Sequence, residues 1–260
     1  MTRLLLGLTI LAPIFAQEHI PVPLADASRP VTMSIHLLRG SVTVRGYSGH
    51  EVIVDTKGGT ASELEKTHEG MHRIGGSGND LSIESDNNKV SISSHGGRSA
   101  DVTVQTPVNT SLNVKTLAGG QIAIEGVSGE IEAQDLNGAV AIRNVSGSVV
   151  ASSLNGSVTV TMTSVKSGSP MSFTSLNGNI DVTLPASIAA DFSMKTHNGE
   201  IYSDFDVKLK GPAKPVAEQT EAKKGKYKVH TESTVAGSVN GGGPEYRFST
   251  MNGNVYIRKK

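Results

Sequence analysis

Residues 117–156 read LAGGQIAIEGVSGEIEAQDLNGAVAIRNVSGSVVASSLNG and nearly repeat themselves every 18 residues. Leu-Asn-Gly at residues 136–138 returns at residues 154–156, and Val-Ser-Gly recurs at the half-way points, residues 127–129 and 145–147. A repeat this short cannot bury an apolar face alone, so neighbouring copies have to stack. The sequence therefore predicts an all-β fold, a single-stranded β-solenoid of many short strands.

The side-chain pattern predicts which residues face the core. After each glycine of the repeat, two apolar residues occur two positions apart, which places them on the same face of a strand. We expect these pairs to stack into an aliphatic column: Ile122/Ile124, Val140/Ile142, Val158/Val160 and Ile180/Val182. The residue two before each glycine predicts a second column: Leu117, Leu136, Leu154 and Leu176, continued less faithfully by His197 and Met251.

The residue directly before glycine is asparagine at positions 137, 155, 177, 198 and 252. Asn and Gly both tolerate the positive φ of a sharp turn, so these pairs are expected to form corners. Asn-Gly is also a strong hairpin signal, and an antiparallel meander is the alternative. The regular alternation of Leu-Asn-Gly with Val-Ser-Gly favours stacking, in which the asparagine amides could pair along the axis.

The N-terminus predicts export. A short cationic region, residues 1–3, precedes an apolar run from Leu4 to Phe15, and Ala16 stands where a signal peptidase would cut. Residues 1–16 are therefore expected to be a signal peptide, because the run is too short to anchor the chain by crossing a bilayer. Without a cysteine, the chain offers neither a lipid-anchoring thiol nor a disulfide framework.

Residues 17–260 are expected to form one β-solenoid domain with two departures from the repeat. Ser62-Glu63-Leu64-Glu65 fits a capping box and predicts one short helix near residues 62–69. The segment from about residue 206 to residue 243 is rich in lysine and predicts a loop excursion, either a solvated one or an anion-binding patch for envelope polysaccharide or lipid phosphate. The repeat resumes at residues 249–257, so the last strand should dock on the preceding coil.

One motif suggests catalysis. His68-Glu69-Gly70-Met71-His72 fits the H-E-x-x-H pattern, in which two histidines hold Zn²⁺ and the glutamate activates bound water. The third histidine of the extended motif would fall at Gly78, which cannot bind a metal. Gly70 also stands mid-helix, where it is unfavourable. We therefore assign no catalytic, cofactor-binding or metal-binding residues and expect a non-enzyme, with a zinc-dependent hydrolase built on His68, Glu69 and His72 as the alternative.

Composition agrees with a binding surface more than with a catalytic pocket. The 24 basic and 24 acidic side chains cancel, so the overall charge does not indicate nucleic acid as a partner. The sequence has no G-x-S-x-G elbow, no phosphate-binding G-x-x-x-x-G-K and no cysteine nucleophile. Asp135, Asp181 and Asp204 stand near turns, where capping of the backbone is the default role.

Three features together resemble a known family. They are GSVTVRG (residues 40–46) and TSLNVKT (residues 110–116), the Leu-Asn-Gly/Val-Ser-Gly alternation, and the ending GGGP…STMNGNV (residues 241–255). This pattern, over most of residues 31–260, resembles the bacterial putative-adhesin family of β-strand-repeat proteins, a domain of unknown function. The resemblance implies a right-handed β-solenoid, exported to the periplasm, the cell envelope or the outside, without an established catalytic site. The expected function is that of an adhesin-like module or envelope scaffold that binds an envelope polysaccharide or a surface protein, with no transmembrane segment in the mature chain.

Overall fold

The computed structural model describes residues 18–57, 81–94, 99–211, 216–217, 231–232 and 234–260. Every regular element in these ranges is a β-strand, which confirms the all-β expectation. The described residues contain no helix, and the short helix expected near residues 62–69 lies outside them.

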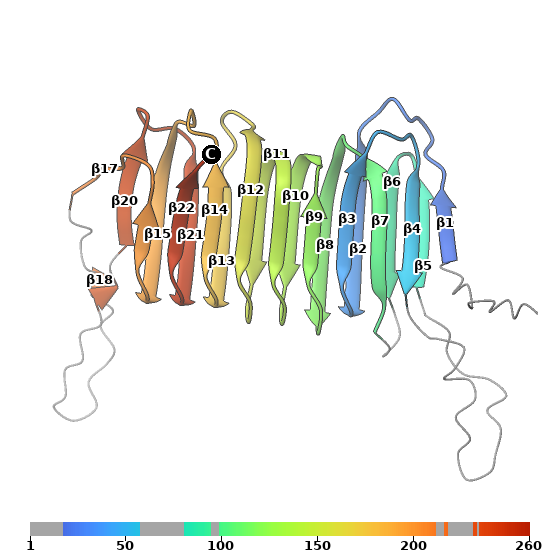
Figure 1. Ribbon diagram of the computed structural model, residues 1–260, viewed down its shortest axis with the longest axis horizontal. Helices are drawn as coiled ribbons and strands as arrows, with labels where there is room; N and C mark the ends of the chain where they lie inside the picture. Colours follow the sequence, from blue (N-terminus) through green and yellow to red (C-terminus); the bar gives the residue numbers. More distant parts are fainter. Residues whose placement is uncertain (1–17, 58–80, 95–98, 212–215, 218–230, 233) are drawn as a thin grey trace, which may run out of the picture.

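Most of the strands join into one hydrogen-bonded network that runs as two ladders along the long axis of the molecule (Figure 1). In spatial order, the first ladder contains β5 (Leu81–Asp86), β6 (Lys89–Ser94), β2 (Val31–Arg39), β8 (Thr110–Ala118), β10 (Ser128–Asp135), the second half of β11 (Val140–Ser153), β13 (Met171–Asn177), β21 (Glu245–Asn252), β15 (Ala190–Asn198), β20 (Thr234–Val239) and β17 (Lys208–Leu209).

The second ladder contains β1 (Glu18–Val22), β4 (Val52–Lys57), β7 (Asp101–Pro107), β3 (Val42–Tyr47), β9 (Ile122–Glu125), the first half of β11, β12 (Val158–Val165), β14 (Ile180–Leu184), β22 (Val255–Lys259) and β16 (Ile201–Ser203). β11 belongs to both ladders because it bends where its pairing with β12 shifts register, between Ile142 and Ser146. A separate small pair is formed by β18 (Val216–Ala217) and β19 (Thr231–Glu232).

The pairing in the repeat is parallel and follows the repeat length. Ile131 stands opposite Val149 in the first ladder, and Val140 stands opposite Val158 in the second. Each Leu-Asn-Gly corner therefore carries the chain from one ladder to the other. Because an antiparallel meander would pair consecutive strands across such a corner, this register excludes the meander for the repeat.

The core lies between the two ladders. The four apolar pairs predicted as an aliphatic column are buried and in register, from Ile122 and Ile124 on β9 to Ile180 and Val182 on β14. Toward the C-terminal end, aromatic rings replace part of the aliphatic packing. The rings of Phe173 and Phe248 stack with centroids 5.2 Å apart. The burial and the register of the four aliphatic pairs confirm the column expected from the alternation.

The order of strands in space differs from their order in the chain at both ends. β2 lies between β6 and β8, and β21 lies between β13 and β15. The last two strands, β21 and β22, therefore pair with β15 and β16, which precede them in the chain. They do not lie at the end of the ladders, because β21 also pairs with β13 and β22 also pairs with β14. Short antiparallel strands finish three of the ladder ends: β5, β1 with β4, and β20 with β17.

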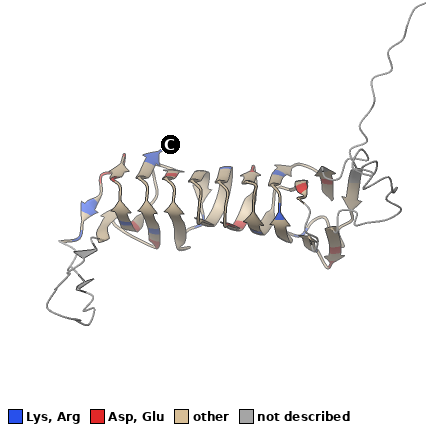
Figure 2. Ribbon diagram, turned by 90° about the horizontal axis from the view of Figure 1, so that it is seen from below, with Lys and Arg blue, Asp and Glu red and all other residues tan. Residues whose placement is uncertain are grey.

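Part of the expected Lys-rich excursion at residues 206–243 is regular structure. β17 and β20 extend the first ladder beyond β15 by antiparallel pairing. Residues 212–215, 218–230 and 233, which include the greater part of the lysine run, lie outside the described residues. Viewed from below, the charged residues of the described ranges are spread along the strands (Figure 2).

Candidate functional site

The catalytic motif of the sequence lies outside the described residues, since His68, Glu69 and His72 fall within residues 58–80. In the described ranges, no group of three or more His, Asp and Glu side chains could hold a metal ion. No helix of sufficient length and apolarity to cross a membrane occurs in these ranges either. The outer surface of the ladders carries the candidate site.

The second column predicted from the sequence exists, but it faces solvent. Leu117 directly follows Thr116, which is buried, and strand alternation points successive side chains to opposite faces. The same holds at each corner, so an exposed aliphatic row crosses the first ladder. Its members are Leu38, Leu117, Leu136, Leu154, Leu176 and Met251, each 37 to 50% exposed, and the exposed His197 continues it on β15.

Small polar residues take the inward position that the leucines do not. In register along the ladder, this row contains Thr116, Asp135, Ser153, Ser175, Thr250 and Thr196. The hydroxyl of Ser153 donates a hydrogen bond to the carbonyl oxygen of Gly138 at 2.8 Å, and Ser175 does the same to Gly156 at 2.9 Å. These bonds tie each corner to the coil that follows.

The corners require glycine because neighbouring backbones lie too close for a side chain, and not because the backbone has a positive φ. The expectation of positive φ at the Asn-Gly corners is wrong, because neither these asparagines nor Gly138, Gly156, Gly178, Gly199 and Gly253 have positive φ. A Cβ at Gly156 would lie 2.2 Å from the carbonyl oxygen of Gly138, and one at Gly178 would lie 2.3 Å from that of Gly156. Stacked corners approach so closely that no side chain fits between them.

The asparagine amides pair along the axis, as the sequence predicts. Asn155 donates to the amide oxygen of Asn137 at 2.8 Å, and Asn177 donates to that of Asn155 at 2.8 Å. Asn252 and Asn198 continue the chain of bonds, at 2.7 and 2.8 Å. We call this series the amide ladder, and it runs along the exposed edge beside the leucine row.

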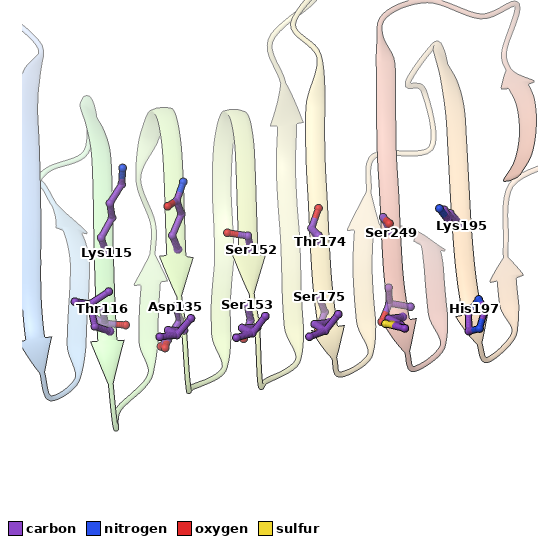
Figure 3. A pocket seen from close by; sticks show the side chains of 17 residues that line it. Lys115, Thr116, Asp135, Ser152, Ser153, Thr174, Ser175, Lys195, His197 and Ser249 are labelled. Atoms are coloured by element: carbon purple, nitrogen blue, oxygen red, sulfur yellow. The ribbon is translucent and has the colours of Figure 1, made fainter. Parts of the chain in front are cut away.

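A third row lies on the other side of the leucines. In register, it contains Lys115, Gln134, Ser152, Thr174, Ser249 and Lys195. Together with the leucine row it lines a shallow, open groove of about 690 Å³ that crosses the strands (Figure 3). The floor of this groove is aliphatic, and hydrogen-bonding side chains border it along its length.

The charges of the groove are mostly basic. Lys115 stands at one end, with its Nζ 3.8 Å from the carboxylate of Glu132, and Lys195 with His197 stands at the other. Asp135 is the one acidic residue among the described lining residues, and it is buried. The groove therefore has a lysine at each end, of which Lys115 is paired with the partly exposed Glu132, and the acidic residue of its own lining is buried.

Asp135 is the exception in the inward polar row. Its Oδ1 accepts a hydrogen bond from the Asn137 backbone N–H at 2.9 Å, which confirms the expected capping role. Its Oδ2 and the hydroxyl of the neighbouring Thr116 are buried without a hydrogen-bond partner among the described residues. Burial raises the pKa of this carboxyl, because the charged form loses hydration that the backbone bonds restore only in part.

A second exposed feature lies at the end of the second ladder. The rings of Tyr202 and Tyr256 stack with centroids 5.3 Å apart, and the Arg258 guanidinium lies 5.4 Å from the Tyr256 centroid. Arg258 also forms a forked hydrogen-bonded pair with Asp181, with its Nε 2.9 Å from Oδ1. Tyr256 already contacts Tyr202 and Arg258, and the Arg258 guanidinium already binds Asp181. We therefore interpret this cluster as a set of contacts that stabilises the end of the sheet.

The chain matches no protein-family model and no curated protein. Two solved structures are similar to it in fold. One, described as a putative cell adhesion protein from Clostridium sporogenes ATCC 15579, has a TM-score of 0.48 and 12% identity, over 94% of this chain and 99% of that chain. The other, described as a putative adhesin from Bacteroides fragilis NCTC 9343, has a TM-score of 0.45 and 11% identity, over 95% of this chain and 99% of that chain.

Proposed function

We propose that this chain is an exported, non-enzymatic β-repeat protein that acts as an adhesin-like module or scaffold in the cell envelope. Its two ladders would form a right-handed β-solenoid, the fold implied by the resemblance of the sequence to the putative-adhesin family. Residues 1–16 would direct export and be removed. The mature chain would bind its partner through repeated equivalent positions and would not turn it over.

The observation that carries this proposal is the exposed leucine row. Single exposed leucines are ordinary on protein surfaces, but a contiguous apolar strip bordered by polar side chains marks an interaction site. Here six neighbouring strands each carry one aliphatic side chain at the same position, on the strand or directly after its end, from Leu38 to Met251. Such an arrangement spreads binding energy over many coils.

Binding is tested with the purified exported chain on an envelope fraction of the producing cell. A variant with Leu136→Ser, Leu154→Ser and Leu176→Ser removes the centre of the row, and Leu209→Ser replaces an exposed leucine outside the groove. We expect the triple variant to lose most of the bound protein and Leu209→Ser to bind like the parent. Equal retention of all three proteins would contradict the proposal.

Export is tested by the N-terminus of the protein recovered outside the cytoplasm. The proposal predicts a chain that begins at Gln17, measured by intact mass and N-terminal sequencing. A protein that keeps residues 1–16 and stays in the cytoplasmic fraction would show that the export part is wrong. Replacement of Leu5 and Leu6 by Asp should abolish export, because it interrupts the apolar run that the export machinery reads.

A further inference from the structure

We propose that the leucine groove binds an extended anionic polysaccharide that lies across the strands, with about one sugar unit per strand. The inference deepens the proposed binding function and rests on it, because it names the chemical class of partner and the residues that contact it.

The width of the apolar strip fits a sugar chain. The leucine row is one side chain wide and is bordered on one side by the hydroxyl and amide groups of Gln134, Ser152 and Thr174. The exposed asparagines of the amide ladder directly follow the leucines in the chain. A pyranose ring has an apolar C–H face surrounded by hydroxyl groups at its edge. A ring placed face-down on a leucine would therefore direct its hydroxyls toward both polar rows.

The amide ladder keeps hydrogen-bonding capacity for a ligand. The side-chain amide of Asn155 uses one N–H to reach Asn137, and its oxygen accepts one N–H from Asn177. A primary amide has two N–H donors and two acceptor lone pairs, so one of each remains at every internal step of the ladder. Donors and acceptors thus recur along the ladder from Asn137 to Asn198, as a chain of hydroxyl-bearing rings requires.

The period of the groove distinguishes a polysaccharide from a peptide. Neighbouring strands are about 4.8 Å apart, so the five steps from Lys115 to Lys195 span about 24 Å. An extended peptide presents side chains on the same face about every 6.6 Å, so its side-chain spacing does not match the spacing of the strands. A β-1,4-linked pyranose advances by about one strand spacing per sugar, so each ring can meet an equivalent set of side chains.

Charge complementarity indicates an anionic chain. Lys115, which lies 3.8 Å from the Glu132 carboxylate, and Lys195 stand at the two ends of the hydroxyl row, and the acidic residue of the lining, Asp135, is buried. Carboxylates on the sugars would meet the two lysine ammonium groups. A second copy of this protein laid antiparallel on the groove would instead bring Lys115 against Lys195, and like charges across an interface are unfavourable.

The class of partner is tested first on the envelope fraction. One portion is digested with protease and another is oxidised with periodate, which cleaves the vicinal diols of sugars, and binding of the exported chain is measured on both. Binding that survives protease and disappears after periodate supports the inference. Binding that disappears after protease and survives periodate overturns it in favour of a protein partner, while the proposed binding function stands; no binding to the untreated fraction overturns both.

The geometry is tested with β-1,4-oligomannuronates of two, four, six and eight sugars, and with neutral β-1,4-oligomannans of the same lengths, by calorimetry. We expect affinity to rise with length up to about six sugars and then level off, because six strands form the described groove. The acidic six-mer should bind about tenfold more tightly than its neutral counterpart at low salt. No binding of the acidic six-mer at millimolar concentration, or no dependence on length, overturns the inference.

Two variants locate the site. Leu136→Ser with Leu154→Ser and Leu176→Ser should weaken binding of the six-mer by at least about tenfold, whereas Leu209→Ser should not. Lys115→Gln with Lys195→Gln should remove most of the preference for the acidic chain and leave binding of the neutral chain unchanged, and Lys89→Gln with Lys260→Gln serves as the matched control. Circular dichroism and thermal unfolding show that each variant is folded. Unchanged binding by the folded leucine variant places the ligand elsewhere and overturns the inference.

Discussion

The side-chain amide of Asn155 donates a hydrogen bond to the amide oxygen of Asn137, 18 residues earlier in the chain and one coil away, at 2.8 Å. The same donor geometry recurs between Asn177 and Asn155. These bonds can form only when the two corners are in register, since a shift by one residue would separate the amides and turn every side chain to the other face. The amide ladder therefore forms only in the stacked arrangement of the corners, and its hydrogen bonds stabilise that arrangement.

Asn155→Ala should destabilise the protein, because it removes two amide hydrogen bonds at once. We expect a loss of about 1 to 2 kcal/mol in the free energy of unfolding, as each bond contributes about 1 kcal/mol net. The measurement is equilibrium unfolding in urea, with Ser152→Ala, near the end of β11, as the control. An Asn155→Ala midpoint equal to that of the control would show that the ladder adds nothing to stability.

Gly156→Ala should be more damaging than alanine at a glycine with positive φ in open space. Its Cβ would lie 2.2 Å from the Gly138 carbonyl oxygen, so the stacked backbones would have to separate. We expect a cost above about 2 kcal/mol, whereas Gly168→Ala, with φ of 76° and nothing near its Cβ, should cost about 1 kcal/mol. Both values come from urea unfolding, and a smaller effect at Gly156 than at Gly168 would contradict the close approach of the corners.

The sequence predicts the interior of the repeat well, because burial and hydrogen bonding there follow local period. Ile142 and Val160 alternate with polar residues, and an alternating strand buried on one face has one choice of register. The pairing of Asn137 with Asn155 follows once the coils stack at the repeat length. These features need no knowledge of distant segments.

The direction of the leucine row was open to prediction but easily missed. Alternation counted from Ile131 and Ala133 places Asp135 inside and Leu136 outside, although hydrophobicity alone suggests the reverse. The inward Ser153 is acceptable because its hydroxyl binds the Gly138 carbonyl oxygen, and that carbonyl becomes available only when corners stack. The polar group and its partner thus come from different coils, so single-sequence patterning does not pair them.

The order of the terminal coils could not be predicted from local pattern. β21 inserts between β13 and β15, and Phe248 on β21 packs against Phe173 and Phe192 from the two flanking strands. Neither the repeat length nor the turn residues specify which existing pair of strands separates to admit the last coil. The choice depends on contacts between segments far apart in the chain.

Asp135→Ser should stabilise the protein at neutral pH. The pKa of Asp135 is raised by burial, so its contribution to stability is present below the pKa of the unfolded chain and is lost as pH rises through the higher folded value. Serine occupies the equivalent position in the next coil and avoids the buried charge. We expect a gain of about 1 kcal/mol at pH 7 that shrinks as pH falls through the raised folded pKa and is gone below about pH 4, the pKa of the unfolded chain.

Urea unfolding of Asp135→Ser between pH 3 and pH 8 checks this expectation, with Asp86→Ser, at an exposed position of β5, as the control. The difference between Asp135→Ser and the parent should widen with rising pH by more than any trend of the control. A difference independent of pH would mean that Asp135 is not the titrating group.

Leu154→Ala and Ile142→Ala separate a binding surface from a core. Both replace a large aliphatic residue, Ile142 on β11 and Leu154 directly after the end of that strand. Ile142 is fully buried, so its truncation leaves a cavity and should cost about 2 to 5 kcal/mol. Leu154 is 39% exposed in the groove, and its truncation should cost less than about 1 kcal/mol. The free energy of unfolding in urea and binding to the envelope fraction are measured on both variants. Loss of binding with near-parental stability in Leu154→Ala assigns the leucine row to recognition, whereas a destabilisation as large as that of Ile142→Ala would assign it to the core.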